Sequence, residues 1–179
     1  EFYKVRVAGL QDQQKMGVEE PDTKKMWSPK KQLQEITKKN RINVRRQYDL
    51  FDLKRKQLNE KGLYFKSVRE LNESDKNEAR AIFEREIKPA ITPYGIDAYR
   101  PFPHLSDGVL HLFVKLKRSG EPFIAIVPVP ERLSRVYGVH NNEHTYLLLI
   151  EDLIYSFLSD LFKGYDVTYS FTFRITRNA

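Results

Sequence analysis

The sequence predicts a multi-domain protein, with an all-α N-terminal helical domain over residues 1–62 and an α+β domain with a mostly antiparallel sheet over residues 63–179. Two observations predict this division. Residues 1–62 hold 16 Lys and Arg against 9 Asp and Glu, whereas residues 63–179 hold 15 of each, so the net charge of +7 lies in the first third. Apolar residues recur at helical spacing in the first part, and alternation is frequent in the second.

Composition narrows the class of protein. The 179 residues are 40% hydrophobic and 31% charged, which excludes a wholly disordered chain and allows packed cores. The absence of Cys excludes disulfides, thiolate zinc sites and Cys nucleophiles, and it fits a reducing compartment. No apolar run approaches the roughly 20 residues that span a bilayer. We therefore expect a cytoplasmic protein, free or peripheral to the inner membrane, and a chain trimmed at its start because it lacks an initiator Met and a signal-peptide pattern.

The clearest element is a helix over residues 30–61. Ser28 is a suitable N-cap, Pro29 suits the first helical position, and Gly62 is a suitable left-handed stop. We expect this helix to pack against a second one over residues 2–16, after a loop over residues 17–27, and against helices missing from this chain. Without those helices, this helix is expected to leave apolar surface exposed. Its apolar stripe contains Leu33, Ile36, Val44, Tyr48, Phe51 and Leu58.

The α+β domain begins with a predicted short strand at residues 63–65. Ser74 is the predicted N-cap of a helix that Pro89 and Pro93 end. Residues 94–108 show no period and predict an ordered loop. The residues that make the buried face of the helix are Ala79, Ile82, Phe83 and Ile87.

Strands dominate the rest of the chain. Residues 110–116 and 123–129 predict a hairpin, residues 145–150 a further strand, and residues 151–162 a helix that ends at Gly164. The last strand, residues 166–175, alternates over ten positions, which predicts one buried and one solvated face. The side chains predicted to face the core are Val167, Tyr169, Phe171, Phe173 and Ile175.

Known catalytic patterns are absent. There is no glycine-rich phosphate loop, no Gly-x-Ser-x-Gly elbow, no His-Glu-x-x-His and no kinase signature. His140 and His144 fall in a predicted polar turn, and His104 and His111 have no orienting partner at a fixed spacing. We therefore predict no catalytic residue and no metal ligand in this chain.

The excess positive charge instead favours an anionic partner such as phosphate, nucleic acid or an acidic protein. Arg174 and Arg177 lie three positions apart at the end of the last strand. Their guanidinium groups could bind phosphate in a bidentate manner. Arg45 and Arg46 lie among the basic residues of the long helix. The alternative interpretation is that these residues form a solvated surface.

Five colinear segments resemble one family. Residues 1–10, Glu-Phe-Tyr-Lys-Val-Arg-Val-Ala-Gly-Leu, are similar to the end of the motif Asn-Leu-Asp-Glu-Phe-Phe-x-Val-Arg-Val-Ala-Gly-Leu of long-chain bacterial polyphosphate kinases. Because the matches cover the whole chain in order, the sequence resembles the N-terminal and head domains of that family, with departures at Tyr3, Lys4 and His104. The other similar segments are residues 91–93 with 101–106, residues 149–154, residues 161–165 and residues 173–179.

The resemblance implies an enzyme that reversibly transfers the terminal phosphate of ATP to polyphosphate, with Mg²⁺, through a phosphohistidine. In the family the phosphohistidine lies in C-terminal domains beyond Ala179, so this chain alone is expected to be inactive. Mg²⁺ is likewise expected to bind outside this chain. The family's adenine-contacting Asn would stand three positions before Glu1, which implies that Phe2 and Arg6 lie near ATP or ADP. Helix packing is the alternative role of Phe2.

The resemblance also implies partners. Polyphosphate is expected at Arg45, Arg46, Arg174 and Arg177, the head domain is expected to mediate the contacts of a dimer, and the C-terminal domains of the same protein complete the enzyme. No DNA is expected.

Two other functions stay open. The first is a basic module without catalytic activity that binds nucleic acid or an acidic protein, which predicts stacking aromatic residues on an exposed sheet face. The predicted burial of Tyr169, Phe171 and Phe173 argues against it. The second is a module that serves dimerisation alone.

Overall fold

The computed structural model describes residues 1–18, 27–96, 102–141 and 143–177. The chain divides into two compact units, which we call the helical unit, Glu1–Gln57 with Thr176–Ala179, and the α+β unit, Leu58–Ile175. Each unit is described by itself. No described helix is long and apolar enough to cross a membrane.

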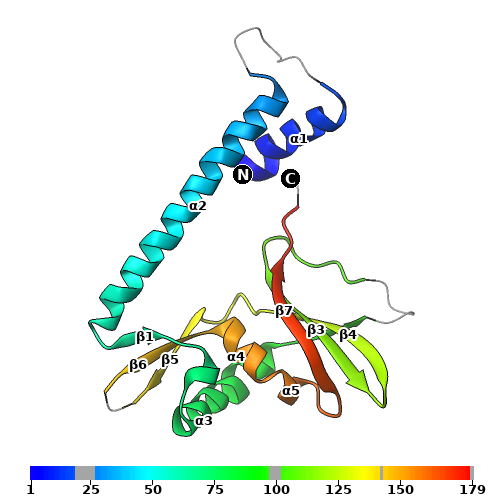
Figure 1. Ribbon diagram of the computed structural model, residues 1–179. Coiled ribbons are helices and arrows are strands. Elements are labelled where there is room, and N and C mark those ends of the chain that lie inside the picture. Colours follow the sequence, from blue (N-terminus) through cyan, green and yellow to red (C-terminus); the bar gives the residue numbers. More distant parts are fainter. Residues whose placement is uncertain (19–26, 97–101, 142, 178–179) are drawn as a thin grey trace. The chain divides into compact units, whose positions relative to one another are not determined.

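The helical unit consists of a π-helical turn η1 (Tyr3–Val7), which continues into α1 (Ala8–Lys15), and the long helix α2 (Pro29–Asn59) (Figure 1). The predicted start of α2 is confirmed, because Pro29 is its first residue and the Ser28 hydroxyl accepts a hydrogen bond from the Lys31 amide at 3.4 Å. Gly62 has the expected left-handed conformation, with φ of 76°. Most of the predicted loop over residues 17–27 lies outside the described residues.

Little of α2 is buried. Pro29 is the one buried residue among the 31 residues of α2. In the shorter α1, two of eight residues are buried, Ala8 and Leu10. The predicted exposure of apolar surface is therefore confirmed. The large apolar side chains of α2 that are exposed are Ile42, Val44, Tyr48, Leu50, Phe51 and Leu53.

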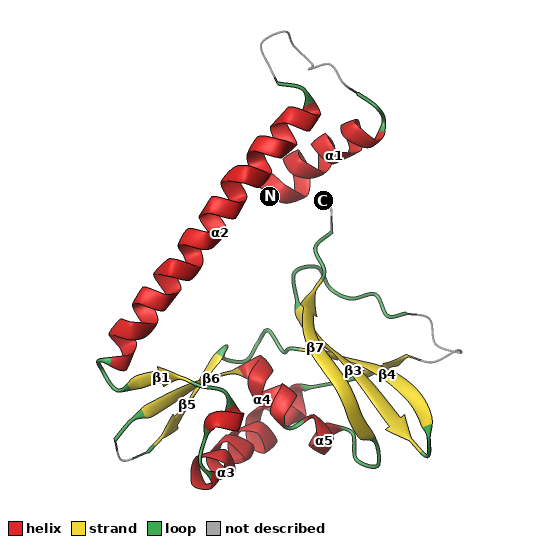
Figure 2. Ribbon diagram, in the orientation of Figure 1, coloured by secondary structure: helices red, strands yellow, loops and turns green. Residues whose placement is uncertain are grey.

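The α+β unit has its own core and contains two sheets (Figure 2). Its helical segments are η2 (Val68–Glu70), α3 (Glu73–Ile82), η3 (Phe83–Ile87), η4 (Lys88–Ala90), α4 (Ile150–Ser156) and α5 (Leu158–Leu161). Its strands are β1 (Leu63–Phe65), β2 (Tyr94–Ile96), β3 (Leu110–Arg118), β4 (Glu121–Pro128), β5 (Val136–His140), β6 (Thr145–Leu149) and β7 (Asp166–Arg174).

One sheet has three strands in the order β1-β6-β5, with β1 parallel to β6 and β5 antiparallel to it. The other sheet has four antiparallel strands in the order β2-β4-β3-β7. The hairpin of β3 and β4 turns at Ser119 and Gly120, both with positive φ, as the Arg-Ser-Gly-Glu sequence predicts. The mostly antiparallel α+β architecture is thus confirmed, although it is divided over two sheets.

The core lies between the helices and the sheets. Phe83 of η3 is fully buried, and its ring lies 5.3 Å from that of Phe157, which follows α4. The predicted burial of Ala79, Ile82 and Ile87 is confirmed. The predicted N-cap is wrong, because the side chain of Asn72, not Ser74, accepts the hydrogen bond from the Asp75 amide.

The prediction that residues 94–108 form a loop is wrong at its start. Residues 94–96 form β2, because their backbone pairs with β4 from Tyr94 opposite Ile126 to Ile96 opposite Ile124. The three residues that follow Pro93 are too few to give a periodic signal in the sequence. The rest of that prediction falls partly on residues 97–101, which lie outside the described residues.

The predicted orientation of β7 is also wrong. Val167 pairs with Leu116 and faces the core, but Tyr169 pairs with Lys115, so Thr168 is an extra residue in the strand, which is the pattern of a β-bulge. Beyond the bulge the aromatic side chains therefore lie on the opposite face from Val167. Tyr169 is 59% exposed and Phe171 is 43% exposed.

Candidate anion-binding groove of the helical unit

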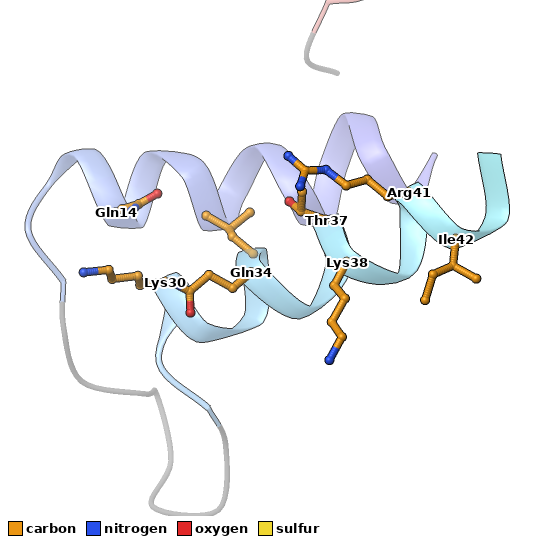
Figure 3. A pocket seen from close by; sticks show the side chains of 8 residues that line it. Gln14, Lys30, Gln34, Thr37, Lys38, Arg41 and Ile42 are labelled. Atoms are coloured by element: carbon orange, nitrogen blue, oxygen red, sulfur yellow. The ribbon is translucent and has the colours of Figure 1, made fainter. Parts of the chain in front are cut away.

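In the helical unit, α1 lies beside the first half of α2 (Figure 3). Two long-range hydrogen bonds join η1, which precedes α1, to α2: the Tyr3 hydroxyl donates to Asn40 Oδ1 at 2.9 Å, and Arg6 Nη2 donates to Gln32 Oε1 at 2.9 Å. The Gln32 side-chain amide in turn donates to the Trp27 carbonyl at 2.6 Å. These polar contacts tie the first helical segment to one stretch of α2.

A groove with a volume of about 730 Å³ lies at this pair of helices, which is within the range of ligand-binding pockets. α1 contributes Gln14, and the other lining residues follow one another along α2 at intervals of three and four, so they share one helix face. Figure 3 shows most of these side chains along the two helices. The residues that line the groove are Gln14, Lys30, Leu33, Gln34, Thr37, Lys38, Arg41 and Ile42.

The charged groups of the groove all have one sign. Lys30, Lys38 and Arg41 line it, and no carboxylate is among its described lining residues. Leu33 and Ile42 add apolar surface. All three cations are exposed, so their attraction for an anion is expected to be screened by salt.

The row of cations continues beyond the groove. Arg45 is one helical turn past Arg41 on the same face and is exposed. We call Lys30, Lys38, Arg41 and Arg45 the cationic ladder, which spans about 22 Å at 1.5 Å per residue. Arg46 is also exposed, about 100° further around the helix. A linear array of cations of this kind suits a linear polyanion better than a single compact ion.

Phe2 and Arg6, predicted near a nucleotide, both belong to the helical unit. The ring of Phe2 is 53% exposed and packs edge to face on Tyr3, with centroids 5.4 Å apart. Arg6 is exposed, and its guanidinium is hydrogen-bonded to Gln32. Packing against neighbouring side chains therefore accounts for part of each position, and the nucleotide role stays a prediction.

Arg174 belongs to the other unit, so the structure does not place it in one site with Arg45 and Arg46. It lines a smaller cavity of about 210 Å³ that also contains Arg135 and the carboxylate of Glu131. Arg177 follows β7 in the segment that is grouped with the helical unit. Their role as anion contacts stays a prediction.

The four histidines are dispersed over the α+β unit. His111 is buried, with Nδ1 2.9 Å from the Val109 carbonyl oxygen, and His140 Nδ1 lies 3.0 Å from the Thr145 hydroxyl. His104 is exposed, whereas His144 packs its ring against that of Tyr64, with centroids 4.9 Å apart. Among the described residues, no group of three or more His, Asp or Glu could hold a metal ion.

Sequence reasoning missed Lys30, Lys38 and Arg41 as binding candidates. The signal was present, because residues 30, 34, 38, 41 and 45 fall on one helical face that lacks Asp and Glu. The spacing of residues along α2 could not show the position of α1, whose Gln14 completes the groove.

Two family models cover most of the chain. Residues 1–66 match the polyphosphate kinase N-terminal domain, and residues 74–179 match the polyphosphate kinase middle domain. The boundary between the two matches falls near the start of the α+β unit.

Whole-sequence comparisons agree. Over 179 residues the chain is 41% identical to the polyphosphate kinase of Staphylococcus saprophyticus, and over 183 residues it is 39% identical to that of Exiguobacterium sibiricum; both comparisons cover the whole chain. The fold is similar to a crystal structure of polyphosphate kinase from Porphyromonas gingivalis, with a TM-score of 0.75 and 25% identity over 99% of the chain. The chain spans 25% and 26% of the length of the two curated relatives and 26% of the crystallised protein.

Proposed function

Because the chain belongs to the polyphosphate kinase family, we propose that it is the N-terminal and middle part of an enzyme that transfers the terminal phosphate of ATP to polyphosphate. The chain spans about a quarter of the length of its relatives. We propose that the phosphohistidine, which the sequence resemblance implies, belongs to the remaining part. None of the four histidines of this chain is assigned as the nucleophile. Residues 1–179 alone are therefore expected to be inactive in phosphate transfer.

The role that we propose for the helical unit is to bind the polyphosphate chain along the cationic ladder. Polyphosphate carries about one negative charge per phosphate, so successive phosphates can interact with successive cations, as nucleic-acid phosphates do with Lys and Arg. The observation that carries this proposal is the groove itself, where Lys30, Lys38 and Arg41 occur without a carboxylate. Arg45 and Arg46 extend the surface along α2.

The same unit would contribute to the nucleotide site. We propose that Phe2 and Arg6 lie near the bound ATP or ADP, with the Arg6 guanidinium exchanging its bond to Gln32 for a phosphate oxygen. Arg can make two parallel hydrogen bonds to a phosphate, which the amide oxygen of Gln32 cannot match. An Arg6→Lys variant would then raise the KM for ATP in the complete enzyme more than the kcat changes.

Mg²⁺ supports phosphoryl transfer by neutralising phosphate charge. The described acidic residues do not form a cluster that fits it, so no step of the reaction is assigned to a metal held by this chain. For the α+β unit we propose the contacts of a homodimer, and we place Arg174 and Arg177 as secondary contacts to anionic substrate.

The test is a titration of the chain with long-chain polyphosphate at several salt concentrations, with Lys38→Gln/Arg41→Gln as the variant. The double substitution is expected to weaken binding about tenfold and to lower the salt dependence by about two released counterions. The matched control is Lys39→Gln/Lys54→Gln, which removes the same charge from the opposite face of α2. Equal losses in both variants would mean that net charge, not the ladder, binds polyphosphate.

A further inference from the structure

We propose that the outward face of the four-stranded sheet binds single-stranded RNA by stacking of its bases. This face, which we call the aromatic face, lies opposite the core-facing side chains of β3, β4 and β7. Its exposed side chains are Lys115 of β3, Tyr169 and Phe171 of β7, and Ile124 of β4. Phe113 and Phe173 are half-buried on the same side of the sheet, whereas His111 and Ile126 are buried there. The function is separate from polyphosphate binding by the helical unit.

The β-bulge of β7 creates this face. Because Thr168 is the extra residue, Val167 faces the core while Tyr169, Phe171 and Phe173 turn outward. The Thr168 hydroxyl donates to the Lys115 carbonyl at 3.0 Å, so the bulge is hydrogen-bonded at this point. The bulge thus re-aims Tyr169 and Phe171 toward solvent and leaves Phe173 half-buried, and exposed aromatic side chains are a feature that folding alone does not require.

The aromatic rings form a continuous array. Phe113 and Phe171 are stacked, with centroids 5.0 Å apart and planes inclined by 24°. Along β7, Tyr169 is 5.8 Å from Phe171, which is 6.1 Å from Phe173, and Phe173 stacks on His111 at 5.5 Å. Tyr169 and Phe171 are the exposed rings of this array, and Phe113, Phe173 and the buried His111 support them. Neighbouring exposed rings on an antiparallel sheet are a surface on which unstacked bases can stack side by side.

Charge favours an anionic partner over an apolar protein surface. Lys115 points from the middle of β3 onto the aromatic face, where its register neighbours are Tyr169 and Ile124, both uncharged. Its neighbour on that face, Lys117, has Asp166 as a register partner. Among the described residues Lys115 makes no ion pair, so it is available to a phosphate of the RNA backbone.

A second copy of the chain fits this surface less well. In a two-fold interface each residue near the axis meets its own equivalent, so Lys115 beside the aromatic array would approach another Lys115. Lys is also depleted from the cores of protein interfaces, where aromatic residues are enriched. Stacked rings beside a lysine that has no ion pair within the described part of the chain therefore point to a ligand that has both bases and phosphates.

The experiment measures binding of the chain to a fluorescein-labelled single-stranded RNA of about 12 nucleotides, a length typical of such sites, by anisotropy between about 50 and 200 mM salt. Tyr169→Leu/Phe171→Leu keeps apolar side chains at two exposed positions but removes both rings. It is expected to weaken RNA binding at least tenfold and to leave polyphosphate binding unchanged. Lys115→Gln is expected to lower the salt dependence of RNA binding by about one counterion.

Two controls keep the result specific. Tyr48→Leu removes an aromatic ring that is 68% exposed on α2, and Lys54→Gln removes a cation there; neither is expected to change the binding of RNA by the sheet. The proposal is overturned if the chain does not bind RNA, if the double Leu variant binds it as the wild type does, or if that variant loses only self-association in sedimentation. Loss of polyphosphate binding in Lys38→Gln/Arg41→Gln is read separately, so failure of either proposal is distinguishable.

Discussion

The helices α2 and α3 form for similar local reasons, but α3 packs in a core whereas most of α2 is not buried. Both begin at a side-chain cap, Ser28 or Asn72, and both carry an amphipathic pattern. α3 buries Ala79 and Ile82 in ten residues, whereas α2 buries only Pro29 in 31. Local signals therefore determine where a helix begins, whereas packing partners determine how much stability its apolar face contributes.

The largest difference in stability between the two helical regions is expected when a buried core side chain is truncated. Phe83→Ala removes a fully buried ring beside Phe157 and is expected to cost the α+β unit about 3–5 kcal/mol of unfolding free energy. Leu50→Ala on α2, where the side chain is 56% exposed, is expected to cost less than about 0.5 kcal/mol. Chemical denaturation followed by circular dichroism measures both, and fluorescence of Trp27, the single tryptophan, reports the helical unit. Similar losses in the two variants would contradict the contrast.

A smaller effect is expected where α4 contacts η2. The Asp152 carboxylate accepts a hydrogen bond from the buried Val68 amide at 2.7 Å, so Asp152→Ala leaves that donor without its partner and is expected to cost about 1–3 kcal/mol. Asp152→Asn retains an acceptor and is expected to avoid this loss. Urea denaturation of both variants measures the difference, and an Asn variant as unstable as the Ala variant would show that the hydrogen bond is not the cause.

The pH dependence of the same position has a definite sign. Burial is the main cause that raises the pKa of Asp152 above 3.8, with Glu70 in the same direction and the Val68 amide and Arg69 opposing. A raised folded-state pKa means that the protonated carboxyl favours folding, and this contribution is lost as the pH rises through the folded-state pKa. Asp152→Asn is therefore expected to gain stability relative to the wild type as the pH rises from about 3.8. A relative gain on acidification would contradict this cause.

Caps provide a finer comparison of the two helices. Asn72→Ala removes an acceptor at 2.9 Å from the Asp75 amide and is expected to cost about 1 kcal/mol in the α+β unit. Ser28→Ala removes a longer contact of 3.4 Å at the start of α2 and is expected to cost about half as much. Thermal unfolding followed by circular dichroism, with Trp27 fluorescence for the helical unit, measures both. A larger loss at Ser28 would mean that α2 depends on its cap more than on its packing against α1.

The smallest stability effect is expected on the uncovered stripe of α2. Leu50→Ser and Leu53→Ser replace apolar side chains that are 56% and 52% exposed, so unfolding free energy is expected to change by less than about 0.5 kcal/mol while solubility rises. Light scattering at increasing protein concentration measures the solubility. A marked loss of stability would show that this stripe is covered in solution.

Elements with strong local signals were predictable from the sequence. Pro29 and Gly62 defined α2 to within a few residues, and Ser119-Gly120 defined the hairpin turn. β2 was missed because a strand of three residues is too short to show a period, and it forms by pairing with β4. Whether such a segment becomes a strand depends on a partner distant in the sequence.

The faces of β7 were predicted in the wrong sense for a different reason. Alternation identifies two sets of residues but does not say which set is buried, and one extra residue at Thr168 exchanges the sets within the strand. The groove could not be predicted from the sequence either. The spacing of its cations shows that they share one helix face, but the contribution of Gln14 depends on the packing of α1 on α2.

We propose that the helical unit, through the cationic ladder, is the part of this chain that binds polyphosphate. Hydrogen exchange measured with and without long-chain polyphosphate is the decisive measurement, because it reports each segment separately. Added protection is expected along residues 30–45, with no change in β3 and β7. Protection confined to the α+β unit, or none anywhere at saturating polyphosphate, would contradict it.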